Sequence, residues 1–174
     1  MRRRQLVLDA STAILLAKID LLREVTSRGA VVMAGTAVDE ALARDSDDAR
    51  MIRSLLDEVR IARVVAPAGT DALMRDFRID RGEAETIAVA RETGATCATD
   101  DGPAIRCCRA LGIAFTSAIG LLAAMAEADV VEPTLALELL AKLQRFGRYD
   151  ARILEDVARR IRAAPSSKKE RGPS

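Results

Sequence analysis

The stretch Leu6-Val7-Leu8-Asp9-Ala10-Ser11 places an acid between a run of apolar residues and a segment with helical spacing. Residues 5–9 predict a short buried strand, and the apolar residues that recur over residues 14–22 predict a helix after it. Open parallel sheets bind their ligands just outside the carboxyl ends of the strands. Asp9 is therefore the first candidate for a functional residue.

Strands and helices alternate along the rest of the chain. Further strands are predicted at residues 30–33, 62–66, 95–99 and 113–116, with helical segments between and after them. This alternation predicts an α/β fold in which a parallel sheet carries helices on both faces.

Local signals predict where several helices begin and end. Thr36 fits an N-cap with an acid, Asp39, three residues later, and Ser46 fits the start of the next helix. Asp80-Arg81-Gly82-Glu83 has the pattern of a capping box, and its helix is predicted to end at Gly94. Other helix starts are predicted near Asp71 and Gly102, after Ser117 and at Pro133, and a last amphipathic helix carries Ile153, Leu154, Val157 and Ile161.

Length and composition predict a soluble globular protein. Of the 174 residues, 49% are hydrophobic and 30% are charged. We expect one domain over residues 1–164 and a disordered basic tail over residues 165–174. No apolar run is long enough to span a bilayer, and no export signal is predicted. The three cysteines, Cys97, Cys107 and Cys108, form no even-numbered disulfide framework, which favours a cytoplasmic location.

The formal net charge is only +1, so it does not indicate which partners the protein binds. Arginine outnumbers lysine several-fold. Guanidinium groups bind phosphate in a bidentate way, although codon bias and solvated helix faces also explain an arginine excess. Aromatic residues make up 2% of the chain, which argues against a base-stacking surface. Any contact with nucleic acid is expected to run mainly through its backbone.

Several acids occupy similar places relative to the predicted strands. Asp9 ends the first strand, and Glu40 lies in the helix after the second. Glu83 heads a long alanine-rich helix, and Asp101 follows the fourth strand, with Asp100 as an alternative ligand there. Carboxylates gathered at one sheet edge repel one another unless a cation neutralises them. Since the chain contains no histidine, oxygen ligands favour a hard ion such as Mg²⁺ or Mn²⁺.

Spacing refines the choice among these residues. Alternation along the fourth strand places Thr99 and Asp101 on one side and Asp100 on the other, which favours Asp101 as the ligand. Ser11 is predicted either to orient the cluster by a hydrogen bond or to cap the first helix. Glu85 is interpreted as a first-turn acid favoured by the helix dipole.

Helix capping is the alternative explanation for most of these acids. Asp9 and Asp101 each precede a predicted helix, and Glu83 can be the return partner of Asp80 in a capping box. A cap contributes roughly 1 kcal/mol, which is reason enough for an acid at each position. Glu40 falls one residue beyond the capping-box position, so capping does not explain it. The joint pattern, with one acid at the end of each of several strand–helix units, favours a metal site.

These residues resemble the PIN-domain family, in its prokaryotic branch with a Gly-Glu-Ala-Glu motif. The resemblance rests on residues 6–11, Glu40, Gly82-Glu83-Ala84-Glu85-Thr86-Ile87-Ala88 and Thr99-Asp100-Asp101, and it covers about residues 5–160. It implies a three-layer α/β/α sandwich with a parallel five-stranded sheet, a Mg²⁺- or Mn²⁺-dependent ribonuclease site, and a role as the toxin of a toxin–antitoxin pair. The resemblance maps the family's acids onto Asp9, Glu40, Glu83 and Asp101, and its Ser/Thr positions onto Ser11 and Thr99.

The resulting hypothesis is hydrolysis of RNA phosphodiester bonds. Asp9, Glu83 and Asp101 would bind one or two divalent ions, and Glu40 would ligate or position a water. A bound metal ion lowers the pKa of water and screens developing charge, and a carboxylate is the other available base. Candidate cations for flanking phosphates are Arg44, Arg81 and Arg106. The expected partners are an RNA substrate, a small antitoxin protein and a second copy in a homodimer, without a membrane.

Two other classes of protein compete with this hypothesis. A catalytically silent module with the same fold would use its Leu/Ala-rich helices, near residues 14–22 and 121–125, as a binding interface. A phosphotransfer receiver also carries acids at strand ends, but it needs an acidic pair after the first strand and a late lysine. Here the pair follows the fourth strand, and no lysine occurs between Lys18 and Lys142.

Overall fold

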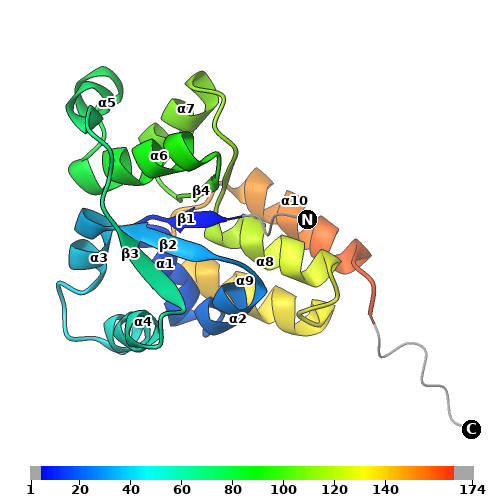
Figure 1. Cartoon of the computed structure of the whole chain (residues 1–174). Coiled ribbons are helices and arrows are strands. Elements are labelled where there is room, and N and C mark those ends of the chain that lie inside the picture. Colours follow the sequence, from blue (N-terminus) through cyan, green and yellow to red (C-terminus); the bar gives the residue numbers. More distant parts are fainter. Residues whose placement is uncertain (1–4, 167–174) are drawn as a thin grey trace, which may run out of the picture. The chain divides into compact units, whose positions relative to one another are not determined.

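A parallel sheet forms the centre of residues 5–117 in the computed structural model, which describes residues 5–166 (Figure 1). Its strands are β1 (Leu6–Leu8), β2 (Val31–Ala34), β3 (Ile61–Val64), β4 (Thr96–Ala98) and β5 (Phe115–Thr116). Their order is β3-β2-β1-β4-β5, and all pairs are parallel. The predicted α/β fold with a parallel five-stranded sheet is confirmed.

The order of the strands reverses beside β1. The chain runs outward from β1 through β2 to β3 and then returns to place β4 on the other side of β1, in a register that pairs Leu8 with Ala98. A ligand crevice is expected at such a switch point, outside the carboxyl ends of the two strands. Asp9 follows β1, and residues 99–101 follow β4, so both segments lie at this switch point.

Helices cover both faces of the sheet within this part of the chain. The helices are α1 (Ala10–Lys18), α2 (Leu22–Arg28), α3 (Gly35–Ala41), α4 (Asp47–Asp57), α5 (Thr70–Phe77), α6 (Arg81–Thr93) and α7 (Gly102–Ala110). Figure 1 shows α5, α6 and α7 on one side of the strands and α1, α2 and α4 on the other. The predicted layering of helix, sheet and helix is therefore present.

Burial of the strands on both faces explains why they read as continuous apolar runs. Val7, Leu8 and Cys97 are fully buried, and so is Ile87 of α6, which packs on the sheet. Strands of a parallel sheet lose their contact with water on two sides, so Val, Ile and Leu replace the alternating pattern of a half-exposed strand.

Two local predictions are wrong. The helical stretch predicted over residues 14–22 is two helices, because α1 ends at Lys18 and Asp20 has a positive φ of 59° before α2 begins. Thr36 is not an N-cap: α3 begins at Gly35, two residues earlier than that cap predicts, after an extended Ala34 that provides no side-chain cap. A distant carboxylate fills the capping role instead, as described below.

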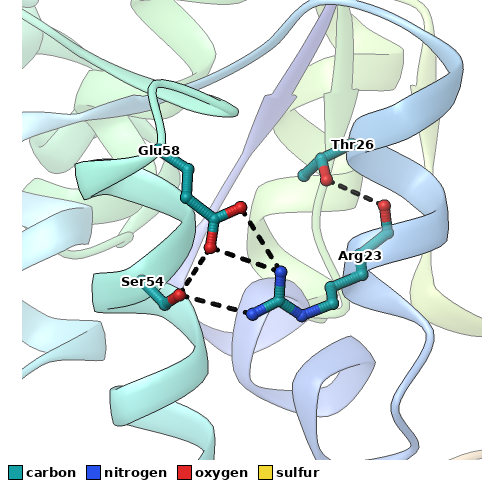
Figure 2. Close-up of polar contacts among 4 residues, drawn as sticks. All are labelled: Arg23, Thr26, Ser54 and Glu58. Carbon is teal, nitrogen blue, oxygen red and sulfur yellow. Dashed lines mark hydrogen bonds and ion pairs between the residues drawn. The ribbon is translucent and has the colours of Figure 1, made fainter.

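A polar cluster joins α2 to α4 on the surface (Figure 2). The Arg23 guanidinium donates to both carboxylate oxygens of Glu58, at 3.3 and 3.4 Å, and to Ser54 Oγ at 3.3 Å. Ser54 Oγ in turn donates to Glu58 at 2.6 Å, and Thr26 Oγ1 donates to the Arg23 carbonyl. Because the pair is exposed, it is expected to contribute little to stability.

The second compact unit, Ala118–Ser174, contains three helices in its described part, residues 118–166. They are α8 (Ala118–Glu127), α9 (Pro133–Phe146) and α10 (Ala151–Ala163), as the sequence predicted. Arg160 of α10 binds Glu127 of α8 through two contacts of 2.8 and 3.0 Å. Of the predicted tail, residues 167–174 lie outside the described residues. None of the helices within residues 5–166 has the length and apolarity needed to cross a bilayer.

Candidate functional site

Asp9 lies at the centre of a hydrogen-bond network at the carboxyl end of β1. Its side chain is only 3% exposed. Oδ1 accepts from Ser11 Oγ and from the Thr12 amide, both at 2.8 Å, so Asp9 caps α1. Oδ2 accepts from Thr99 Oγ1, at the end of β4, at 2.5 Å. One carboxylate therefore ties the helix start to the neighbouring strand.

Asp9 is nevertheless in an unfavourable environment for a charge. Its pKa is raised, mainly because burial penalises the ionised form. The hydrogen bonds from Thr12, Thr99 and Ser11 oppose this shift, while the charge of Asp100 adds to it. A buried carboxylate with this balance gains from any bound cation, because a cation favours the ionised form.

The segment after β4 supplies both predicted acids. Asp101 caps α7 by accepting from the Ala104 amide at 2.9 Å, and its own amide donates to Thr99 Oγ1 at 3.2 Å. Asp100 accepts from Thr12 Oγ1 at 2.7 Å. The sequence favours Asp101 as the ligand, with Asp100 as the alternative. In the structure both acids of the pair contact the network, and the charge of Asp100 raises the pKa of Asp9.

Glu83, in the first turn of α6, caps the helix and also interacts with neighbouring acids. It completes a capping box, in which its amide donates to Asp80 Oδ1 at 2.8 Å and its Oε2 accepts from the Asp80 amide at 3.0 Å. Its pKa is raised to about 7, first by partial burial and then by the charges of Asp80, Asp101 and Asp9. The capping explanation is therefore correct, and Glu83 also lies within electrostatic reach of the other acids.

Glu40 reaches the same region from α3. It lies in the last turn of this short helix, and its carboxylate packs against Gly82 of α6. A Cβ added at Gly82 would lie 2.6 Å from Glu40 Oε2 and 2.7 Å from Oε1. Partial burial raises the pKa of Glu40, and the charges of Asp80, Asp9 and Glu85 raise it further. Only glycine at position 82 leaves room for this approach.

Two acids of this region were missed as site residues from sequence. Asp80 was interpreted only as a cap, yet its charge raises the pKa of both Glu40 and Glu83. The sequence predicts that Glu85 interacts only with the dipole of its own helix, but its carboxylate accepts from the Thr36 amide at 3.2 Å, across a sequence separation of 49 residues. The density of acids over residues 80–85 was the available signal.

The carboxylates of this region are suitable ligands for a divalent cation, but their present positions do not form a complete metal site. No group of three acidic or cysteine side chains within residues 5–166 is close enough to hold a metal ion as it stands. The donors are all carboxylate oxygens, which hard ions prefer. Asp9 Oδ1 uses its lone pairs on Ser11 and Thr12, whereas Oδ2 accepts one hydrogen bond and keeps a lone pair for another partner.

Comparison with known families identifies the class of protein. A family model described as a PIN domain matches residues 5–163, nearly the whole chain, so this protein belongs to the PIN-domain family. No curated protein gives a significant match. This match confirms the predicted family. PIN domains are in general nucleases that use divalent metal ions such as Mg²⁺.

Proposed function

We propose that this chain is a Mg²⁺- or Mn²⁺-dependent endoribonuclease whose site is the acid cluster around Asp9. The observation that carries the proposal is the environment of Asp9. A nearly fully buried carboxylate is held by Ser11, Thr12 and Thr99, while its pKa is raised rather than lowered. Acids kept at a cost to the fold are typical of functional sites.

Each residue has a distinct proposed role. Asp9, Glu83 and Asp101 hold the ion, with Asp100 as the alternative ligand, and Glu40 ligates or positions a water. Ser11 and Thr99 are positioning residues that fix the Asp9 carboxylate by hydrogen bonds. When bound, the metal ion supplies Lewis-acid activation of water and screening of phosphate charge. Since the chain has no histidine, the Glu40 carboxylate is the side chain that we assign to accept the proton from the attacking water.

The test is cleavage of a labelled single-stranded RNA by the purified protein. We expect cleavage with Mg²⁺ or Mn²⁺, loss of activity in EDTA, and loss in Asp9→Asn. Asp76→Asn is the matched control, because Asp76 is exposed on α5 and forms no hydrogen bond or ion pair with any other residue in the range 5–166. A DNA strand of the same sequence tests RNA preference. Equal cleavage by the wild type and Asp9→Asn would refute the proposal.

A non-catalytic binding module is the second candidate, and one observation favours it. Glu83 already has a structural role in the capping box, and the acids within residues 5–166 are not arranged as a metal site. Metal titration separates the two functions. A rise in thermal stability with Mn²⁺ in the wild type, absent in Asp9→Asn, supports the nuclease, whereas no rise and no cleavage support the binding module.

We further propose that this activity is that of a cytoplasmic toxin that acts as a homodimer and is restrained by a small antitoxin protein. Growth arrest on expression of the wild type, relieved by Asp9→Asn or by co-expression of a neighbouring small gene, supports the toxin role. Expression without any effect on growth would contradict it, and light scattering measures the oligomeric state.

A further inference from the structure

A pocket of about 340 Å³ lies directly beside the acid cluster. It is bounded by α1, α3 and the start of α4, and Glu40 forms part of its wall. Ile14, Ala41 and Ala43 give it apolar surface, while Lys18 and Arg44 add positive charge. Its volume is within the range of pockets that hold small organic groups.

Glu40 and helix α1 link the pocket to the acid cluster. Glu40 belongs both to the pocket and to the acid cluster. Helix α1 begins after its cap at Asp9 and ends at Lys18. At 1.5 Å per residue, Ile14 and Lys18 lie roughly 7 and 13 Å from Asp9 along the helix axis. A nucleotide chain with a phosphate at Asp9 can therefore extend its neighbouring nucleotide into the pocket.

Charge explains why such a subsite is needed. The acid cluster repels the phosphates of RNA, so cations beside it must hold the strand. Arg44 is exposed and forms no ion pair with any other residue in the range 5–166, so its guanidinium is available to a phosphate. The other acid of the pocket, Asp48, lies in the first turn of α4.

We propose that this pocket binds the nucleotide next to the scissile phosphate of single-stranded RNA, with Arg44 and Lys18 holding its phosphate and Ile14, Ala41 and Ala43 contacting its base. The inference rests on the proposed nuclease function. Small apolar residues leave space for a flat base, and a base can enter only when it is not paired in a duplex.

The experiment measures RNA affinity in a background that does not depend on cleavage. A fluorescein-labelled single-stranded oligouridine is titrated by anisotropy into Asp9→Asn and into Asp9→Asn carrying Arg44→Ala. We expect Arg44→Ala to weaken binding about tenfold, the effect of one lost charge-assisted hydrogen bond. The slope of log Kd against log salt should fall by about 0.7, as expected for one phosphate contact of a single strand.

Two further variants complete the test. Arg75→Ala removes an arginine from the exposed surface of α5 and should change neither Kd nor slope. Ala43→Phe keeps every charge but fills the pocket from an exposed position, and should weaken binding as strongly as Arg44→Ala. Circular dichroism checks that each variant is folded.

The outcomes separate this inference from the proposed function. Cleavage by the wild type, with RNA affinity unchanged in Arg44→Ala and Ala43→Phe, overturns the pocket and leaves the nuclease. RNA affinity that is lowered by both Arg44→Ala and Ala43→Phe, without any cleavage by the wild type, supports RNA binding in the pocket but overturns the nuclease and hence the position next to a scissile phosphate. No binding of the RNA by Asp9→Asn or the wild type overturns the pocket as well.

Discussion

The acids around Asp9 and the acids in the surface ion pairs lie in opposite environments. Glu58 accepts hydrogen bonds from Ser54 and Arg23, and these lower its pKa. Glu83, the same residue type, has its pKa raised to about 7 by burial and by neighbouring acids. The surface pair is arranged so that ionisation favours the folded state, whereas ionisation of the cluster opposes it. Ionisation of Asp9, Glu40 and Glu83 therefore costs stability that a bound cation would restore.

Removing the Thr99 hydroxyl should have the largest effect, because it breaks the link that makes the buried acid tolerable. Thr99→Val keeps the side-chain shape but deletes the hydrogen bond to Asp9 and the acceptor for the Asp101 amide. We expect the free energy of unfolding to fall by about 1–3 kcal/mol and RNA cleavage to fall about 10–100-fold. Urea denaturation and the cleavage assay measure the two effects.

Thr93→Val is the matched control for this change, since the Thr93 hydroxyl donates only to the Val89 carbonyl within α6. It should leave cleavage unchanged. Equal losses of activity in the two variants would show that the Thr99–Asp9 contact has no special role.

Titration of Glu83 should sharpen the comparison. Its folded pKa of about 7 exceeds the ordinary value of 4.5, so the folded state holds the proton more tightly. The stability that the folded protein gains from the protonated Glu83 is fully present below pH 4.5 and is lost as the pH rises through 7. After allowance for solvent screening, we expect the loss to be about 1–2 kcal/mol. Urea denaturation in EDTA from pH 4 to 8, compared with Glu83→Gln, isolates this contribution. If the difference in free energy of unfolding between the wild type and Glu83→Gln does not change with pH, the prediction is contradicted.

Gly82→Ala tests whether the close approach of Glu40 is functional. The new methyl group would overlap the Glu40 carboxylate, which can move because it ends a flexible side chain. Alanine also favours the helix by a few tenths of a kcal/mol up to about 1 kcal/mol. We therefore expect unchanged or slightly increased stability together with reduced cleavage. If Gly82→Ala loses stability but keeps full activity, Gly82 is needed only for packing.

Arg23→Ala should have the smallest effect, because it removes an exposed ion pair. The expected loss of stability is smaller than that of Thr99→Val, and it should shrink as salt is added. RNA cleavage should be unaffected. A large, salt-independent loss in urea denaturation would mean that the contacts between α2 and α4 matter more than the exposure of the pair suggests.

The sequence predicts those features of the molecule that depend on nearby residues. Strand positions follow from apolar runs, and the caps at Ser46, Asp80 and Asp101 are formed with residues three positions away. The capping interpretation of Glu83 is confirmed, and the charges of Asp9 and Asp101 also raise the pKa of its carboxyl group. One carboxylate can bond its own helix end and still face acids from other strands.

The errors concern features that depend on distant residues or on backbone choices without a sequence signal. The amide of Thr36 is capped by Glu85, from another helix, so no local pattern could place the start of α3. The break between α1 and α2 passes through Asp20 at positive φ, where no glycine marks it. The relation of Asp80 to Glu40 likewise requires the folded contact between α3 and α6.

The central place of β1 has a consequence for synthesis of the protein. Asp9 gains its Thr99 partner only when a segment 90 residues later has been added to the sheet. A chain still on the ribosome and ending before β4 carries Asp9, Glu40 and Glu83, but it lacks the strand that would hold them in one place. The acid cluster is therefore expected to be complete only after residues 96–101 have been synthesised and have joined the sheet.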